Sequence, residues 1–270
     1  MMNILLPTDF SENSRNAAAY AMQFFKDTSC NFHLLHVLDA PAEKMVTGFM
    51  TMPGDVQQKF NELLAWLNQT RTNPNHHFHI SFKVNYLIEA VRSQVLEKNI
   101  DLILMGTKGA TNKQGVVIGK HTSDVMRKVK CPVLAISENA VFKEHKEILF
   151  PTDYKIHYGS RMLRTLLNLA SLSNANVKIL EIFNSEKEPS PEQAENRNFL
   201  QDSFSPKVPV LQTFYASKEQ GPRKVFMANR NVDMIVLAAK NLNLCNKFLQ
   251  NDQDDNIPFI NQLPLLVLHG

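Results

Sequence analysis

The sequence predicts an α/β protein of two tandem domains, each with a five-stranded parallel sheet covered by helices on both faces. Two observations support this prediction. Short apolar segments alternate with amphipathic ones along the chain. Three motifs of the first half also return in the same order in the second half, which indicates a duplication. The pairs are Ile4–Phe10 with Ile148–Tyr154, Asp101–Gly109 with Asp233–Asn241, and Cys131–Ile136 with Leu263–Leu268.

The boundary between the halves is expected in the polar stretch Ser137–Lys146. We therefore predict domains over residues 1–140 and 145–270. A chain of 270 residues is long for one domain and sufficient for two of ordinary size.

In the first half, the apolar run Asn3–Pro7 predicts the opening strand. Ser11 is a plausible N-cap of the following helix, which carries Ala17, Ala21 and Phe24 at helical spacing. The remaining segments alternate in the same way. The predicted strands are Asn3–Pro7, Asn31–Leu38, His77–Val84, Asp101–Met105 and Pro132–Ser137, and the predicted helices are Ser11–Lys26, Val56–Thr70, Ile88–Lys98 and Thr122–Val129.

The second half follows the same plan, so its strands are also expected to be parallel, with right-handed crossovers. Its predicted strands are Glu147–Pro151, Asn176–Phe183, Val208–Tyr215, Met234–Ala238 and Leu265–Leu268, and its predicted helices are Gly159–Ser171, Pro191–Asp202 and Glu219–Asn229. Ligands of such sheets bind beyond the carboxyl ends of the strands, where the strand order reverses.

Charge and cysteine content exclude several classes of protein. The net charge of +3 comes from 29 basic and 26 acidic residues without a long basic run, so neither nucleic acid nor membrane is an expected partner. No window approaches the roughly 20 apolar residues of a membrane span, and the start of the chain lacks a signal-peptide pattern. Three widely spaced cysteines, Cys30, Cys131 and Cys245, are typical of buried thiols in a reducing compartment. We expect a soluble, cytoplasmic protein.

One loop of the first half has the residues of a phosphate cradle. The strand that ends at Met105 is followed by Gly106 and Gly109, and nine residues separate Gly109 from Gly119. Glycines let the backbone approach a ligand closely. A helix that starts after Gly119 offers free N–H groups and the positive end of its dipole to an anion. The spacing is not that of a Walker A loop.

Together with Pro7, Thr8 and Asp9 after the first strand, this loop resembles the ATP-binding signature of universal stress proteins. The resemblance covers essentially the whole chain, as a tandem member with Rossmann-like (nucleotide α-hydrolase-like) domains. It implies an adenine nucleotide, ATP or else ADP or AMP, with or without Mg²⁺. It also implies that the two halves pack as a pseudo-dimer, with further homodimerisation as an option. The implied binding residues are Pro7, Thr8, Asp9, Val37, Met105, Gly106, Gly109, Gly119, Lys120, His121 and Thr122.

Within this set, the resemblance places Asp9 and Val37 at the adenosine. It places Gly106 and Gly109 over the ribose and phosphates, and Gly119 and Thr122 at the phosphates. Asp9 has an alternative role as a turn and helix-capping acid.

Lys120 departs from the family pattern, which has Ser or Thr after the last glycine. Lysine at a helix start opposes the dipole by about 0.3–1 kcal/mol, and a bound phosphate would reverse that effect. Three alternatives stay open: Lys120 strengthens phosphate binding, swings away, or fills the pocket and blocks ATP.

The second half lacks the loop glycines, because Ala238 and Asn241 stand where the first half has Gly106 and Gly109. We therefore predict that its loop is degenerate and that this half supports the first.

Other clusters are weighed against simpler explanations. His76, His77 and His79 cluster at a strand, and His77 and His79 share one face, but exposed strand-edge histidines without a metal are expected. His33 and His36 are three residues apart in one strand and therefore face opposite sides. The acids of 252–255 lack the glycine and the oxygen ladder of an EF-hand. The Met- and Phe-bearing segment Ala40–Asp55 is either a lid or partner surface, or a loop that packs down.

Three functions compete at this stage. The first is a regulatory, non-enzymatic stress-response protein that binds an adenine nucleotide in its first domain, with slow incidental ATP hydrolysis as an option. The second is a nucleotide-free interaction scaffold of the same fold. The third is an ATP pyrophosphatase or adenylyl transferase, which the turn Pro7–Ser11 disfavours because it has neither an S-G-G-x-D-S loop nor an H-I-G-H signature.

Overall fold

The structure is a computed structural model that describes residues 1–39, 51–107, 118–184, 188–204, 211–216, 231–241 and 263–270. The chain divides into two compact units, Met1–Phe142 and Lys143–Gly270. In the described ranges, no helix is both long enough and apolar enough to cross a membrane.

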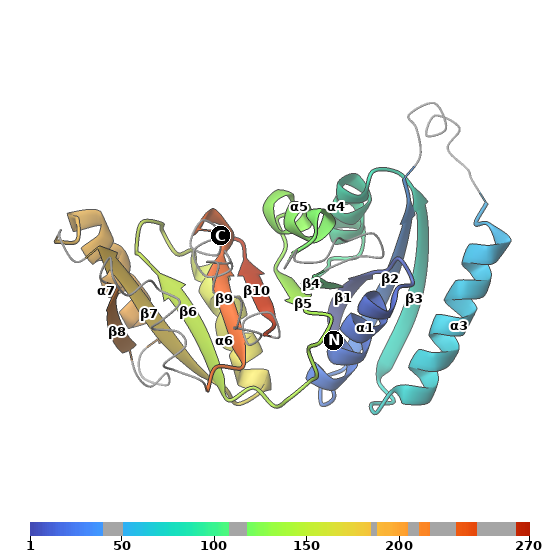
Figure 1. The fold of residues 1–270 in the computed structure, drawn as a ribbon, viewed down its shortest axis with the longest axis horizontal. Helices are drawn as coiled ribbons and strands as arrows, with labels where there is room; N and C mark the ends of the chain where they lie inside the picture. Colours follow the sequence, from blue (N-terminus) through green and yellow to red (C-terminus); the bar gives the residue numbers. More distant parts are fainter. Residues whose placement is uncertain (40–50, 108–117, 185–187, 205–210, 217–230, 242–262) are drawn as a thin grey trace, which may run out of the picture. The chain divides into compact units, whose positions relative to one another are not determined.

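The first unit is built on a parallel sheet with the strand order β3-β2-β1-β4-β5 (Figure 1). Its central strand β1 pairs with both neighbours, so that Ile4 lies opposite Phe32 on one side and Leu102 on the other. The strands are β1 Met2–Pro7, β2 Cys30–Leu38, β3 His76–Val84, β4 Leu102–Gly106 and β5 Val133–Ile136.

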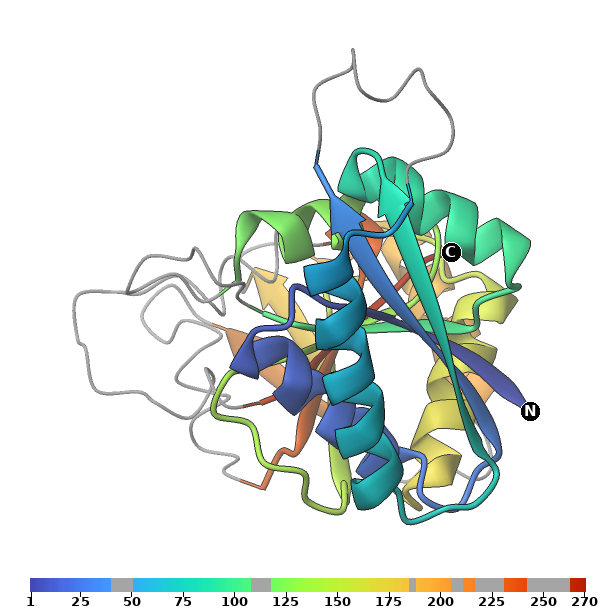
Figure 2. The ribbon, with the colours of Figure 1, turned by 90° about the vertical axis from the view of Figure 1, so that its right-hand side faces the viewer.

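Helices cover both faces of this sheet, and α1 and α3 lie side by side on one of them (Figure 2). On that face Phe60 of α3 contacts His36 of β2. On the opposite face Gln94 of α4 accepts a hydrogen bond from the Ser81 hydroxyl of β3. The strands are therefore buried from two sides, which explains their continuous apolar runs. The helices are α1 Glu12–Phe24, α3 Gly54–Thr70, α4 Leu87–Glu97 and α5 Lys120–Lys128.

The segment after β5 is fastened to α1. The Asn16 amide donates hydrogen bonds to the carbonyls of Ser137 (3.1 Å) and Ala140 (3.0 Å). Phe142 packs edge-on against Tyr20, with ring centroids 5.4 Å apart. These contacts explain why the first unit extends through the polar stretch as far as Phe142.

The second unit repeats the plan with the order β10-β9-β6-β7-β8, and its neighbouring strands are again parallel. A 3-10 turn, η1 Ala239–Asn241, follows β9 directly. The strands are β6 Glu147–Thr152, β7 Asn176–Asn184, β8 Leu211–Ala216, β9 Met234–Ala238 and β10 Leu265–Leu268, and the helices are α6 Ser160–Leu172 and α7 Pro191–Phe204.

In both units the strand order reverses beside the first strand. From β1 the chain continues to β2 and β3 on one side, and then to β4 and β5 on the other. From β6 it continues to β7 and β8, and then to β9 and β10. We call the carboxyl ends of β1 and β4 the first switch point, and those of β6 and β9 the second switch point. These are the places where parallel α/β sheets bind ligands.

A repeated aspartate fixes the opposite end of the same strands. Asp101 accepts a hydrogen bond from the Asn3 N–H at 2.8 Å. Asp233 accepts bonds from the Lys146 and Glu147 N–H groups at 2.8 and 3.1 Å. Each carboxylate therefore ties the entry of the fourth strand to the start of the first, which gives the repeated acid a structural role.

The predicted fold class is confirmed: both units have parallel strands in the same order, and helices cover both faces of the sheet in the first unit. The predicted strands and helices agree with the observed ones within a few residues where both are described. The helix after Gly119 begins at Lys120, two residues before the predicted start. The predicted helix Glu219–Asn229, most of the segment Ala40–Asp55 and the acids of 252–255 lie outside the described residues.

Candidate functional site

The turn after β1 is held by its own side chains. The Thr8 hydroxyl accepts a hydrogen bond from the Phe10 N–H at 3.0 Å and contacts the Ser14 hydroxyl at 3.1 Å. Phe10 has a φ of 62°, in the left-handed region that side chains other than glycine rarely adopt. The chain therefore turns sharply into α1 at the first switch point. Pro7 is the last residue of β1 and pairs with Leu35.

Asp9 projects from this turn and is exposed. Its Oδ1 accepts hydrogen bonds from the Ser11 N–H (3.1 Å) and the Ser11 hydroxyl (2.5 Å). Ser11 is in turn the N-cap of α1 and accepts a bond from the Ser14 N–H. The alternative that Asp9 stabilises the turn is thus supported, and its exposure leaves the carboxylate accessible to a ligand as well.

Gly106 ends β4 on the other side of the first switch point, where the Asn13 side chain lies against it. A Cβ on Gly106 would meet the Asn13 Cγ at 2.9 Å, closer than such contacts occur in proteins. The sequence suggested that this glycine admits a ligand. In the structure, the space beside Gly106 is taken by the Asn13 side chain of α1.

Two hydrogen bonds close the base of the loop between β4 and α5. The Gly119 N–H donates to the Thr107 carbonyl at 2.6 Å. The buried Thr122 hydroxyl donates to the Gly106 carbonyl at 2.8 Å. Since its proton is used in this bond, Thr122 fixes the helix to the strand end. Gly109 lies outside the described residues.

The amino-terminal end of α5 is electropositive. Its N-cap, Gly119, offers no side-chain hydrogen bond to the free N–H groups, and the first turn contains no acid. Lys120 and His121 are both exposed in that turn. The Asp124 carboxylate, one turn further on, forms its ion pair with Lys128 at 2.9 Å. Helix dipole, free N–H groups and Lys120 all favour an anion here.

On the β2 side, Val37 and His36 point to opposite faces of the sheet because they are neighbours in one strand. His36 Nδ1 lies 2.8 Å from the Thr8 carbonyl oxygen. The His36 ring also packs against the Phe10 ring, with the two ring centroids 4.6 Å apart. A carbonyl can only accept, so Nδ1 carries the proton. Sequence reasoning missed His36 as a support of the turn. Met105, in β4, is buried.

The other histidines are distributed as single groups or pairs. His33 and His79 lie opposite each other on β2 and β3, with their rings stacked at 5.1 Å. His77 is exposed, and His76 is buried with its Nε2 3.0 Å from the Phe25 carbonyl. Among the described residues, no three His, Cys, Asp or Glu side chains are placed to hold a metal ion.

The fold and this arrangement define a duplicated Rossmann-like α/β protein with an anion-favouring helix start at its first switch point. The universal stress protein family matches residues 1–137, half of the chain, and the chain belongs to this family.

Named relatives agree with this assignment. Two universal stress proteins of Methanocaldococcus jannaschii are 28% identical over 150 residues (49% of this chain, 93% of the relative) and 25% identical over 144 residues (50% and 81%). The solved universal stress protein from Archaeoglobus fulgidus is 17% identical, with a TM-score of 0.65 over 99% of this chain and 96% of its own. That likeness shows that the fold extends over both halves.

Proposed function

We propose that this protein binds one adenine nucleotide, ATP in the first place, at the first switch point, and that it acts as a regulatory stress-response protein. The observation that carries the proposal is the meeting of two features at that point. An exposed carboxylate, Asp9, follows β1, and the electropositive start of α5 follows the neighbouring strand β4.

Each feature suits a different part of a nucleotide. A carboxylate accepts hydrogen bonds from ribose hydroxyls, and a helix start with an adjacent lysine favours phosphates. Lys120 is exposed in this structure, which agrees with a role as a phosphate contact better than with a role as a plug. Gly106 and Thr122 then act indirectly, by holding the strand end and the helix start together.

Calorimetric titration of the full chain with ATP tests the proposal, and the duplication provides a matched control. We expect one ATP per chain, with affinity reduced at least tenfold in Asp9→Ala and in Gly109→Val. Asp153→Ala, which removes the corresponding acid of the second half, is expected to retain the wild-type affinity. Circular dichroism of each variant verifies that it is folded.

Two other results would change the proposal. Two sites per chain would contradict the restriction to the first half. No binding at millimolar ATP would leave the nucleotide-free scaffold as the function. For the regulatory role, we expect phosphate release from ATP to be over a hundredfold slower than the rate of about 1 per second at the slow end of typical enzymes. A faster rate would identify an ATPase.

A further inference from the structure

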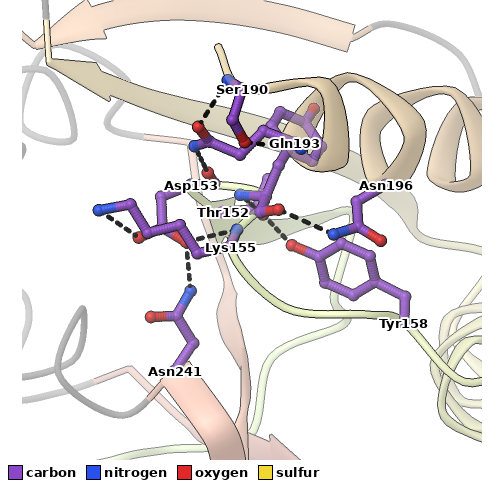
Figure 3. A network of polar contacts seen from close by, with 9 residues as sticks. Thr152, Asp153, Lys155, Tyr158, Ser190, Gln193, Asn196 and Asn241 are labelled. Carbon is purple, nitrogen blue, oxygen red and sulfur yellow. Dashed lines mark hydrogen bonds and ion pairs between the residues drawn. The ribbon is translucent and has the colours of Figure 1, made fainter.

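The second switch point is built differently from the first. Asn241 is the last residue of the turn η1 after β9, and its side-chain amide donates a hydrogen bond to Asp153 Oδ1 at 2.9 Å. Asp153 follows β6, so this single contact joins the ends of the two strands between which the order reverses (Figure 3). The corresponding residue of the first half is Gly109, which has no side chain.

The residue correspondence rests on geometry as well as on sequence. Asp101 and Asp233 each accept a hydrogen bond from the backbone N–H of equivalent residues, Asn3 and Glu147, and β4 and β9 then each run for five residues. Counting eight residues on from each of these acids gives Gly109 and Asn241. Asn241 therefore stands in the loop position at which the first half carries its second glycine.

Near this contact, two further residues of the second half differ from their counterparts in the first half. Tyr154 stands in the place of Phe10, and its hydroxyl donates to Glu181 Oε1 at 2.8 Å. Glu181 of β7 pairs with Thr152. In the first half the same register, continued one residue beyond the Pro7–Leu35 pair, sets His36 opposite Thr8. Glu181 therefore corresponds to His36. The fully buried Glu181 carboxylate is also bonded by Arg197 of α7, at 2.8 and 3.2 Å. The polar side chains found only in the second half, those of Tyr154 and Glu181, are thus bonded to each other.

The Asp153 turn is fixed from further directions. The Gln193 amide donates to the Asp153 carbonyl at 2.6 Å, and the Asn196 amide donates to the Tyr154 carbonyl at 3.0 Å (Figure 3). Gln193 itself is positioned by reciprocal bonds with Ser190 at the start of α7.

We propose that the second switch point is closed by the chain itself, with the Asn241 amide bonded to Asp153 Oδ1 so that the ends of β6 and β9 are tied together without a ligand. The two strand ends are then held by the chain's own side chains rather than by an exchangeable ligand. This inference concerns the second half alone and does not depend on nucleotide binding by the first.

A double-mutant cycle on the full chain without nucleotide tests the contact. We expect Asn241→Ala and Asp153→Ala each to lower the folding equilibrium constant of the second half about five- to thirtyfold, with the double variant close to the more damaging single one. Asn241→Asp keeps the shape but removes the donor and places two acids together, so it should be at least as damaging as alanine. Lys240→Ala, an exposed neighbour on the same turn, should have no effect.

Amide hydrogen exchange gives the local readout. The Lys155 N–H is bonded to Asp153 Oδ1 at 3.2 Å, so its exchange should accelerate several-fold in Asn241→Ala. Additive effects in the cycle, or unchanged exchange at Lys155, would overturn the proposal.

Exchange in the presence of millimolar ATP separates this inference from the proposed function. If the second switch point is closed, ATP leaves the exchange of residues 153–155 unchanged, and protection there would overturn the inference. If the first half does not bind nucleotide, residues 9–12 also remain unprotected, while the cycle at Asn241 and Asp153 still gives its own result.

Discussion

Phe10 and Tyr154 adopt the same uncommon backbone conformation, 144 residues apart, with φ values of 62° and 57°. In both, the backbone N–H donates to the threonine hydroxyl two residues earlier at 3.0 Å. The geometry was therefore retained in both copies while the side chains around it diverged. A left-handed residue with a large side chain costs about 1–2 kcal/mol, which the threonine bond helps to offset.

The two threonines should differ in their contribution to stability. We expect Thr8→Val to lower the free energy of unfolding by about 1 kcal/mol, because its partner lies at a partly exposed turn. Thr152→Val should cost about 2–3 kcal/mol, since Thr152 is buried and its hydroxyl also contacts the buried Tyr158 hydroxyl. Denaturant unfolding measures both. Equal losses of stability in the two variants would contradict the expectation that the buried threonine contributes more.

Much of the fold is predictable from the sequence because the repeat and the alternation of apolar segments reflect strands buried on both faces. The role of Asp101 and Asp233 is not predictable in this way, since their motif shows only that the acid recurs. The contact of Asn241 with Asp153 also required the structure. In the sequence, Asn241 indicates a lost glycine, but the partner lies 88 residues away and is reached only through the strand order.

The close approach of Asn13 to Gly106 makes a second prediction. We expect Gly106→Ala to lower the free energy of unfolding by about 1–3 kcal/mol, because the new methyl group meets the Asn13 side chain at 2.9 Å. The double variant Asn13→Ala, Gly106→Ala should recover part of the loss, measured by denaturant unfolding. Gly54→Ala is the control: nothing lies within 4 Å of that Cβ, and it begins helix α3. A loss in Gly54→Ala equal to that in Gly106→Ala would contradict the steric explanation.

Stability in acid should depend on His33. Its burial, followed by the charges of His79 and Lys98, lowers the pKa of His33 from 6.5 to about 4. The unfolded chain therefore binds more protons between these values. The contribution of the buried, neutral His33 to the free energy of unfolding is therefore complete above pH 6.5 and is lost as the pH falls toward 4. Since one pKa unit corresponds to about 1.4 kcal/mol, we expect a loss of about 2–3 kcal/mol over this range.

Urea unfolding between pH 4 and 7 measures this effect. His33→Phe, which keeps a ring stacked on His79, should flatten the acid dependence of the free energy of unfolding. His77→Phe, at an exposed position of the neighbouring strand, should leave the dependence unchanged. His145, whose pKa burial lowers to about 4, adds a similar dependence in the second half that neither variant removes. An acid slope that is the same in both variants would exclude His33 as its source.

The last prediction concerns the number of charges on the nucleotide. Lys120 is exposed at the start of α5, and the nearby Asp124 is paired with Lys128, so Lys120 opposes the helix dipole without a compensating acid in its own turn. A bound polyphosphate would offset the repulsion between the Lys120 charge and the helix dipole, and this effect should grow with the negative charge of the ligand. We expect Lys120→Ser to weaken ATP binding about three- to tenfold and AMP binding by less than twofold, measured by calorimetry at low salt.

Lys130→Ala, an exposed lysine just beyond the other end of α5, is the control for net charge and should leave both affinities unchanged. The difference between ATP and AMP should also shrink as salt is added, because screening acts on the charge of Lys120 and not on the adenosine contacts. If Lys120→Ser instead tightens ATP binding, the lysine obstructs the site, and the serine or threonine of the family pattern is the better phosphate contact. Equal weakening of ATP and AMP would mean that Lys120 acts on the helix start as a whole rather than on the outer phosphates.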